Sequence, residues 1–71
     1  HMRRYRSCFV GRSAVDWLVA NGYADNRETA VAIGNQLYER MFFHHVAYDH
    51  NFKDEKLFYR FLSHKKTKAL N

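Results

Sequence analysis

The stretch formed by residues 8–19, Cys-Phe-Val-Gly-Arg-Ser-Ala-Val-Asp-Trp-Leu-Val, constrains the fold more than any other part of the chain. It contains the only Trp and the only Cys, and it has the signals of a helix start. Ser13 can cap the exposed N–H groups of the following turn, and Asp16, at the third helical position, faces the positive end of the helix dipole. Asn21-Gly22 supplies a stop, because Gly adopts the left-handed conformation that ends helices. The pattern predicts a short helix that begins at Ser13.

The apolar residues of this helix predict one buried face. They are Ala14, Val15, Trp17, Leu18 and Val19. Their three- and four-residue spacing is typical of an amphipathic helix packed against a core. We therefore expect Trp17 to be a core residue, and Cys8 just before the helix to be one as well.

A second, longer helix is predicted to begin near Asn26 and to run through Arg40. Asp25 and Glu28 have the spacing of a capping box. The apolar face carries Ala30, Ile33, Gly34, Leu37, Tyr38 and Met41, and the polar face carries Arg27, Asn35, Gln36 and Arg40. Gly34 in a helix interior costs about 1 kcal/mol relative to Ala, which a close crossing with the first helix would explain.

From residue 43 the apolar period changes from that of a helix to that of strands. Residues 43–48 and 57–62 alternate in the manner of strands, and the residues between them have turn chemistry. They predict an antiparallel β-hairpin packed over the helices, and residues 3–8 predict an extended arm. The fold class is therefore α+β: a small winged-helix-like domain in which helices pack with a C-terminal antiparallel β-hairpin.

Composition limits the class of protein. Seventy-one residues with 46% hydrophobic and 17% aromatic side chains make one small folded domain. The single Cys excludes an internal disulfide, and with no long apolar run we expect an intracellular, soluble chain. The net charge of +5 lies at the ends: residues 1–12 carry four Arg and no acid, and residues 53–71 carry six basic and two acidic residues. Such basic ends favour an anionic partner.

The residues do not assemble a catalytic or metal site. His44 and His45 are adjacent on a predicted strand, so they point to opposite faces and do not suit one zinc ion. The run that starts at Asp49 has Asp54 where a calcium loop needs Gly and Arg60 where it needs Glu. No acid, base and nucleophile come together. We therefore expect neither a metal nor a cofactor, and no enzymatic activity.

Two helices followed by a hairpin also outline a winged-helix nucleic-acid-binding domain, which is the alternative function. Asn35, Gln36 and Arg40 are the residue types that read base edges. However, residues 25–40 contain two Arg against Asp25, Glu28 and Glu39, and this net negative charge opposes docking on phosphates. We expect nucleic acid not to be the partner.

Three stretches together resemble the DEP family, named for Dishevelled, Egl-10 and pleckstrin. They are Cys-Phe-Val-Gly at 8–11 with Val-Asp-Trp-Leu at 15–18, then Asn-Arg-Glu-Thr-Ala-Val at 26–31 as far as Leu37, then His-Val at 45–46 with Phe-Lys-Asp-Glu at 52–55 and Leu-Phe-Tyr-Arg-Phe at 57–61. The resemblance implies a winged-helix-type domain without catalytic activity, which targets signalling proteins to membranes and binds receptor tails, partner proteins or anionic phospholipid.

The resemblance also implies domain boundaries. We expect a DEP domain over residues 3–62 and a basic tail at residues 63–71. Family members usually begin with a helix before the Phe-Val-Gly turn, and we expect either that this sequence starts too late to hold that helix or that the fold differs. Its absence would expose apolar surface on the remaining helices, which a second copy could cover as a homodimer with exchanged elements.

The basic residues are the predicted contacts for lipid and partner. They are Arg3, Arg4, Arg6 and Arg12 around the arm and the first helix, and Lys53, Lys56, Lys65, Lys66 and Lys68 in the hairpin and tail. Each adds about 1 kcal/mol on an anionic leaflet. We expect a cytoplasmic protein that associates reversibly with the membrane periphery, with Tyr5 and Phe52 exposed for a signalling protein or receptor tail.

Overall fold

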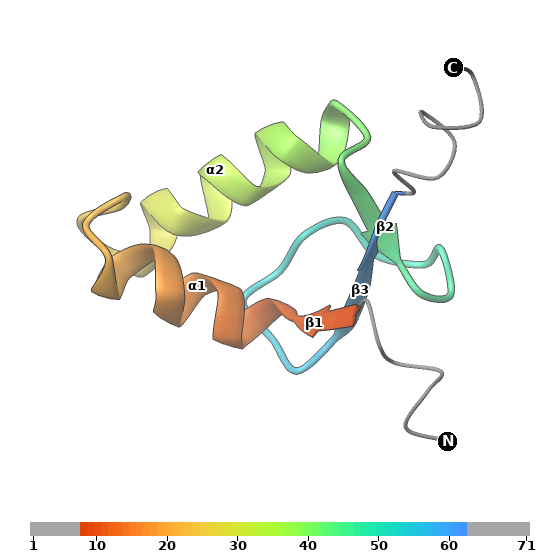
Figure 1. Cartoon of the computed structure of the whole chain (residues 1–71), viewed down its shortest axis with the longest axis horizontal. Coiled ribbons are helices and arrows are strands. Elements are labelled where there is room, and N and C mark those ends of the chain that lie inside the picture. Colours follow the sequence, from red (N-terminus) through yellow and green to blue (C-terminus); the bar gives the residue numbers. More distant parts are fainter. Residues whose placement is uncertain (1–7, 63–71) are drawn as a thin grey trace, which may run out of the picture.

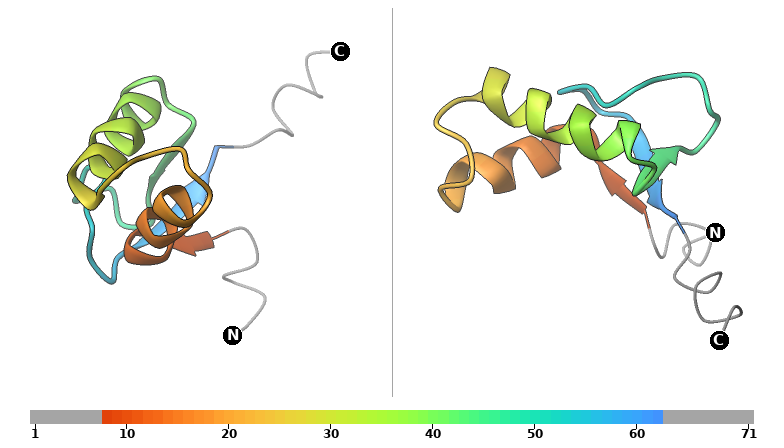
Figure 2. Two further views of the ribbon diagram at one scale, coloured as in Figure 1. Left: turned by 90° about the vertical axis from the view of Figure 1, so that its left-hand side faces the viewer. Right: turned by 90° about the horizontal axis from the view of Figure 1, so that it is seen from above.

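Two helices lie side by side and a small sheet closes one end of the pair (Figures 1 and 2). The computed structural model describes residues 8–62. The two helices are joined at the end away from the sheet. In chain order the elements are β1 (Cys8–Val10), α1 (Gly11–Ala20), α2 (Arg27–Glu39), β2 (Phe43–His45) and β3 (Phe58–Phe61).

The sheet has the order β1-β3-β2, and both pairs are antiparallel. The predicted hairpin is therefore confirmed as the β2–β3 pair, with strands shorter than residues 43–48 and 57–62. Residues 3–7 of the predicted arm lie outside the described residues, and Cys8 begins a third strand that the sequence did not indicate, in which it pairs with Arg60. In the middle strand β3, Tyr59 points into the core and is fully buried, whereas Phe58, Arg60 and Phe61 are exposed.

The start of α1 differs from the prediction. The helix begins at Gly11, two residues before Ser13, and its N-cap Val10 makes no side-chain bond. Backbone carbonyls cap it instead: the N–H of Gly11 donates to Leu57 O and the N–H of Arg12 to Glu55 O, both at 2.9 Å. A polar cap is unnecessary because the loop before β3 satisfies these donors.

The start of α2 was predicted correctly, although the capping residue differs. Asn26, rather than Asp25, is the N-cap, and its side chain accepts a hydrogen bond of 2.8 Å from the N–H of Thr29. The helix ends at Glu39 with Arg40 as C-cap. Met41 follows with a φ of 66°, a left-handed conformation that turns the chain into β2.

The core is assembled from both helices, the sheet and the loops. Its buried residues are Val15, Ala24, Ala30, Phe43, Phe52 and Tyr59. The prediction that Trp17 belongs here is wrong, because its side chain is 55% exposed and stacks on Tyr23. Two residues along a helix correspond to a rotation of about 200°, so a helix that buries Val15 turns Trp17 away. Cys8 is half-buried at the edge of the sheet.

Phe52 packs directly on Gly34, which corrects two predictions. Phe52 was expected to be exposed, yet it is 2% exposed. A Cβ on Gly34 would collide with the Phe52 ring, so Gly34 makes room for a loop residue rather than for a helix crossing. Next to it, Asn35 Oδ1 accepts from the N–H of Phe52 at 3.1 Å and Asn35 Nδ2 donates to Phe52 O at 2.9 Å.

Tyr59 secures the same loop from the sheet. Its hydroxyl donates to Asn51 O at 2.6 Å and accepts from the N–H of Lys53 at 3.0 Å. The Phe43 ring lies 5.6 Å from both the Phe52 and the Tyr59 rings. Residues 51–53 are therefore fixed on three sides, by α2, β2 and β3.

The contact between Gly34 and Phe52 predicts whether replacing Gly34 raises or lowers the stability of the fold. In an exposed helix interior, a Gly→Ala change raises the free energy of unfolding by about 1 kcal/mol. Here the added methyl group displaces a buried ring, so we expect the free energy of unfolding to fall by about 2 kcal/mol. Urea denaturation measures this. The control Ala32→Gly, at an exposed position of the same helix, should lose only about 1 kcal/mol. A Gly34→Ala variant more stable than the wild type would contradict the packing.

Candidate functional site

Three of the predicted basic residues lie at one corner of the molecule. Lys53 and Lys56 belong to the loop whose carbonyls cap α1, and Arg12 is bonded through its N–H to Glu55 in that loop. All three are exposed. The capping of α1 by this loop therefore brings together cations that are forty residues apart in the sequence, and we name Arg12, Lys53 and Lys56 the basic corner.

The other six predicted basic residues lie outside the described residues. They are Arg3, Arg4, Arg6, Lys65, Lys66 and Lys68. The segments that carry them precede Cys8 and follow Leu62. Cys8 pairs with Arg60 whereas Val10 pairs with Phe58, so the first and last described residues lie at the same end of the β1–β3 pair. The basic corner lies at the opposite end of this pair, where α1 begins.

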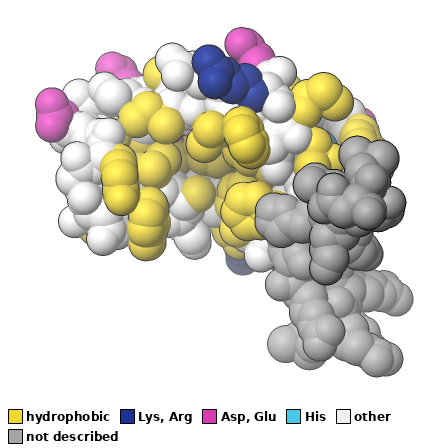
Figure 3. Space-filling view, turned by 45° about the horizontal axis from the view of Figure 1, so that its top comes forward, with side chains coloured by type: hydrophobic (Ala, Val, Ile, Leu, Met, Phe, Trp, Pro, Cys, Tyr) yellow, Lys and Arg dark blue, Asp and Glu magenta, His cyan; other side chains and the backbone are white. Residues whose placement is uncertain are grey.

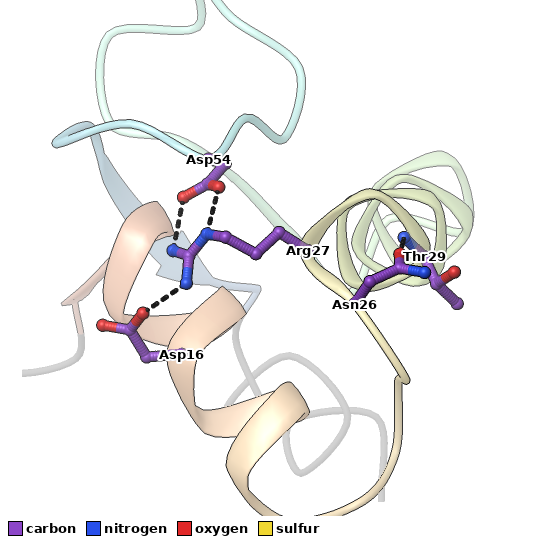
Figure 4. Close-up of polar contacts among 5 residues, drawn as sticks. All are labelled: Asp16, Asn26, Arg27, Thr29 and Asp54. Atoms are coloured by element: carbon purple, nitrogen blue, oxygen red, sulfur yellow. Dashed lines mark hydrogen bonds and ion pairs between the residues drawn. The ribbon is translucent and has the colours of Figure 1, made fainter.

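Arg27, the first residue of α2, joins the loop that carries Lys53 and Lys56 to α1 (Figure 4). Its Nε and Nη2 donate to the two carboxylate oxygens of Asp54 at 2.7 and 2.8 Å, and its Nη1 donates to Asp16 at 2.8 Å. Hydrogen bonds from Arg27 hold the pKa of Asp54 below its usual value, and bonds to Asp54 and then to Asp16 raise the pKa of Arg27. Asp54 thus stays charged, and both carboxylates are paired with Arg27.

The sequence pattern does not indicate this arrangement. Arg27 was predicted to lie on the solvent face of α2, and Asp16 to interact with the dipole of α1. In the structure Asp16 lies beyond the first turn of α1 and contacts Arg27. The partners are 11 and 27 residues apart, so no helical spacing indicates them. For the basic corner, the consequence is that Asp54, between Lys53 and Lys56, is neutralised by Arg27.

The residues considered for nucleic-acid recognition do not form one set. Asn35 is half-buried, and its amide is bonded to both backbone groups of Phe52 and to Val31 O. Gln36 and Arg40 are exposed. One of the two amide side chains suited to reading adenine is therefore occupied in holding the loop at residues 51–53.

An apolar groove of about 900 Å³ lies between the helices and the sheet. Its lining is Phe9, Ser13, Ala14, Trp17, Leu18, Leu37, Met41, Phe42, Phe43, Phe52, Phe61 and Leu62. Figure 3 shows hydrophobic side chains gathered in a broad band on one face of the molecule, with few charges among them. Met41 is 69% exposed and Phe61 54%. The expected apolar surface on the helices is therefore present.

The two histidines of β2 lie on opposite faces of the strand, as predicted from the alternation of side chains along a strand. His45 is buried and His44 half-buried. Within residues 8–62, no group of three or more His, Cys, Asp or Glu side chains is placed to hold a metal ion. Neither described helix is long and apolar enough to cross a membrane.

Comparison with known proteins identifies the family. The model of the "Domain found in Dishevelled, Egl-10, and Pleckstrin (DEP)" matches residues 1–61. The human phosphatidylinositol 3,4,5-trisphosphate-dependent Rac exchanger 2 protein is 38% identical over 71 residues, which are 100% of this chain and 4% of that protein. The vacuolar membrane-associated protein IML1 of Coccidioides immitis is 44% identical over 61 residues, which are 84% of this chain and 3% of that protein. The chain thus spans only a small part of these multidomain relatives.

The fold is that of a solved family member. The solution structure of the DEP domain of human pleckstrin matches with a TM-score of 0.71 and 28% sequence identity, over 83% of this chain and 55% of that chain. Domains of this kind are non-catalytic modules of signalling and membrane-targeting proteins. On the match of sequence, motifs and fold together, this chain belongs to the DEP family.

Proposed function

We propose that this DEP domain is a non-catalytic signalling adaptor that attaches weakly and reversibly to anionic membrane lipid and docks a signalling protein or receptor tail. The observation that carries the lipid part is the basic corner. The loop at 53–57 is fixed to the start of α1 by two backbone hydrogen bonds and holds Lys53 and Lys56 beside Arg12. Cations on a fixed backbone bind a charged surface with little loss of backbone entropy.

The strength of this attachment follows from the number of cations. Each exposed basic group near an anionic leaflet contributes about 1 kcal/mol, within a Debye length of the surface. The basic corner supplies three such groups, and Arg27 keeps the charge of Asp54 from opposing them. Arg3, Arg4, Arg6, Lys65, Lys66 and Lys68 add to this in our proposal. The cytoplasmic leaflet, which carries the anionic lipids, is the surface that fits, so attachment is peripheral and sensitive to salt.

The names of two relatives support an anionic membrane surface as the target. One is a phosphatidylinositol 3,4,5-trisphosphate-dependent Rac exchanger, and another is a vacuolar membrane-associated protein. This chain matches 4% of the first and 3% of the second, so the role of the whole protein is part of the proposal. Phe52 is buried and has no part in it. We assign protein contacts to the apolar groove instead, whose exposed Trp17, Met41 and Phe42 fit a protein surface.

A second copy of the chain is the proposed occupant of the groove when no other partner is present. The groove exposes large apolar side chains that monomeric proteins rarely leave uncovered in one contiguous patch. Because the lining comes from both helices, the three strands and the loop residue Phe52, an element exchanged between two chains would bury it from both.

Sedimentation with vesicles tests the lipid part. The 71-residue chain should bind vesicles that contain phosphatidic acid or phosphatidylserine, and not vesicles of phosphatidylcholine alone. Lys53→Ala with Lys56→Ala should weaken binding roughly 30-fold, since two cations at about 1 kcal/mol each are lost. Replacing Arg3, Arg4, Arg6 and Arg12 with Ala should also weaken it, with the free energy of unfolding nearly unchanged. Higher salt should lower binding in every case.

The control and the contrary outcomes are equally specific. Arg40→Ala removes one exposed cation outside the basic corner and should change binding least. Equal binding to acidic and neutral vesicles would remove the lipid part. Binding to duplex DNA that varies with the DNA sequence, without binding to acidic vesicles, would favour the nucleic-acid alternative.

Light scattering tests the homodimer. The chain should approach a dimer mass as its concentration rises, and Met41→Lys, which places a charge in the groove, should shift it towards the monomer. Tyr48→Lys is the matched control, because Tyr48 is as exposed as Met41 but does not line the groove. A monomer mass at all concentrations would rule out the dimer and leave the lipid proposal untouched.

A further inference from the structure

The turn that follows β2 is built around the side chain of His45. The N–H groups of Ala47 and Asp49 both donate to His45 Nδ1, at 3.1 and 3.3 Å. Between them, the N–H of Tyr48 donates to the main-chain O of His45 at 2.9 Å. The three successive N–H groups of residues 47–49 therefore all donate to His45.

The two bonds to the ring fix its protonation state. A ring nitrogen that accepts hydrogen bonds must keep its lone pair, so His45 is neutral with its proton on Nε2. A protonated ring carries N–H groups on both nitrogens. It would direct its Nδ1 proton at the N–H groups of Ala47 and Asp49, so the closed turn is compatible with the neutral ring alone.

The surroundings of the ring also favour the neutral form. His45 is 7% exposed. The titratable and charged groups around it are Tyr59 with its ring centre at 5.6 Å, His50 at 4.7 Å, Asp49, His44 and, across the ladder from His44, Arg60. Burial lowers the pKa of His45 below its ordinary 6.5; the charges of His50 and His44 lower it further, and that of Asp49 opposes them.

The turn adopts a conformation that needs such bonds. Tyr48 has a φ of 63°, in the left-handed region that an aromatic residue rarely occupies. Its ring stacks on His44 with centres 4.4 Å apart and an interplanar angle of 7°. When the bonds to Nδ1 are lost, relaxation of the backbone is opposed by this stacking, by the contact of the Tyr48 hydroxyl with His44 Nε2 at 3.4 Å, and by the bond from the Tyr48 N–H to His45 O.

We propose that His45 and residues 46–50 form a pH-sensitive latch, in which the neutral ring holds the turn closed and protonation of Nδ1 opens it. In the open turn the His45 ring binds a proton with the ordinary affinity of imidazole. In the closed turn it binds the proton more weakly, because Nδ1 is occupied as an acceptor. The closed turn is therefore fully stable above about pH 6.5 and loses stability as the pH falls below that value. This latch does not depend on the proposed function.

Opening is limited to the turn by the contacts that follow it. Asn51 O is bonded to the buried Tyr59 hydroxyl, and Phe52 is held by Asn35 and the core. These contacts contain no group that titrates near neutral pH. Acid should therefore release Tyr48, which is exposed, while the loop beyond Asn51 keeps its place.

An NMR titration of the 71-residue chain, from about pH 8 to about pH 5, tests the latch within the range where imidazoles titrate. At the upper limit the ring ¹⁵N shifts of His45 should show the Nε2–H tautomer. On acidification the amides of Ala47 and Asp49 should lose their hydrogen-bonded shifts with the midpoint of His45, and the ratio of open to closed turn should rise up to tenfold per pH unit. The amide shifts of Phe52 and Lys53 should not change with the protonation of His45.

Two variants separate His45 from its neighbours. His45→Asn keeps a side-chain acceptor for the turn but does not titrate, so its turn amides should be insensitive to pH. His50→Asn is the matched control and should keep the transition. An Nδ1–H tautomer at neutral pH, or turn amides that ignore the protonation of His45 in the wild type, would overturn the proposal even if His45→Asn does not fold.

Discussion

The burial of Phe52 against Gly34 is the contact on which the rest of the structure depends. Residues 46–57 contain no helix or strand, and a connection of this length is usually mobile unless something holds it. Here Phe52 enters the core, the Asn35 amide binds both of its backbone groups, and the Tyr59 hydroxyl bonds the residues on either side. The loop is consequently part of the packed domain rather than an appendage to it.

This anchoring determines the surface that we assign to membrane contact. Beyond Phe52 the chain passes the start of α1, where carbonyls of Glu55 and Leu57 accept from the first helical N–H groups. The same segment presents Lys53 and Lys56, while Arg27 ties Asp54 to α1 and α2. The capping of α1, the ion pair between Arg27 and Asp54, and the basic corner therefore all depend on the position of this one loop. A chain that kept the charges but lost the anchor would carry the same cations on a flexible segment.

Local signals in the sequence predicted well what depends on neighbouring residues. The Asn26 start of α2, the β2–β3 hairpin and the family motifs follow from spacing within a few residues. What the sequence did not reveal depends on contacts between distant segments. The start of α1 is set by carbonyls more than forty residues away, Phe52 is buried only because Gly34 leaves room for it, and Arg27 meets an aspartate 27 residues later. Trp17 was misplaced because it lies about 200° around the helix from Val15, the residue that α1 buries.

Native-state hydrogen exchange of individual amides tests the central role of the Phe52 anchor most directly. The N–H of Phe52 is bonded to Asn35 and that of Lys53 to Tyr59, although both lie in a segment without regular structure. If the anchor holds, these two amides exchange as slowly as the amides in the middle of α2, because both are released only by global unfolding. Exchange of the Phe52 and Lys53 amides at the rate of an exposed loop, while α2 stays protected, would contradict the account.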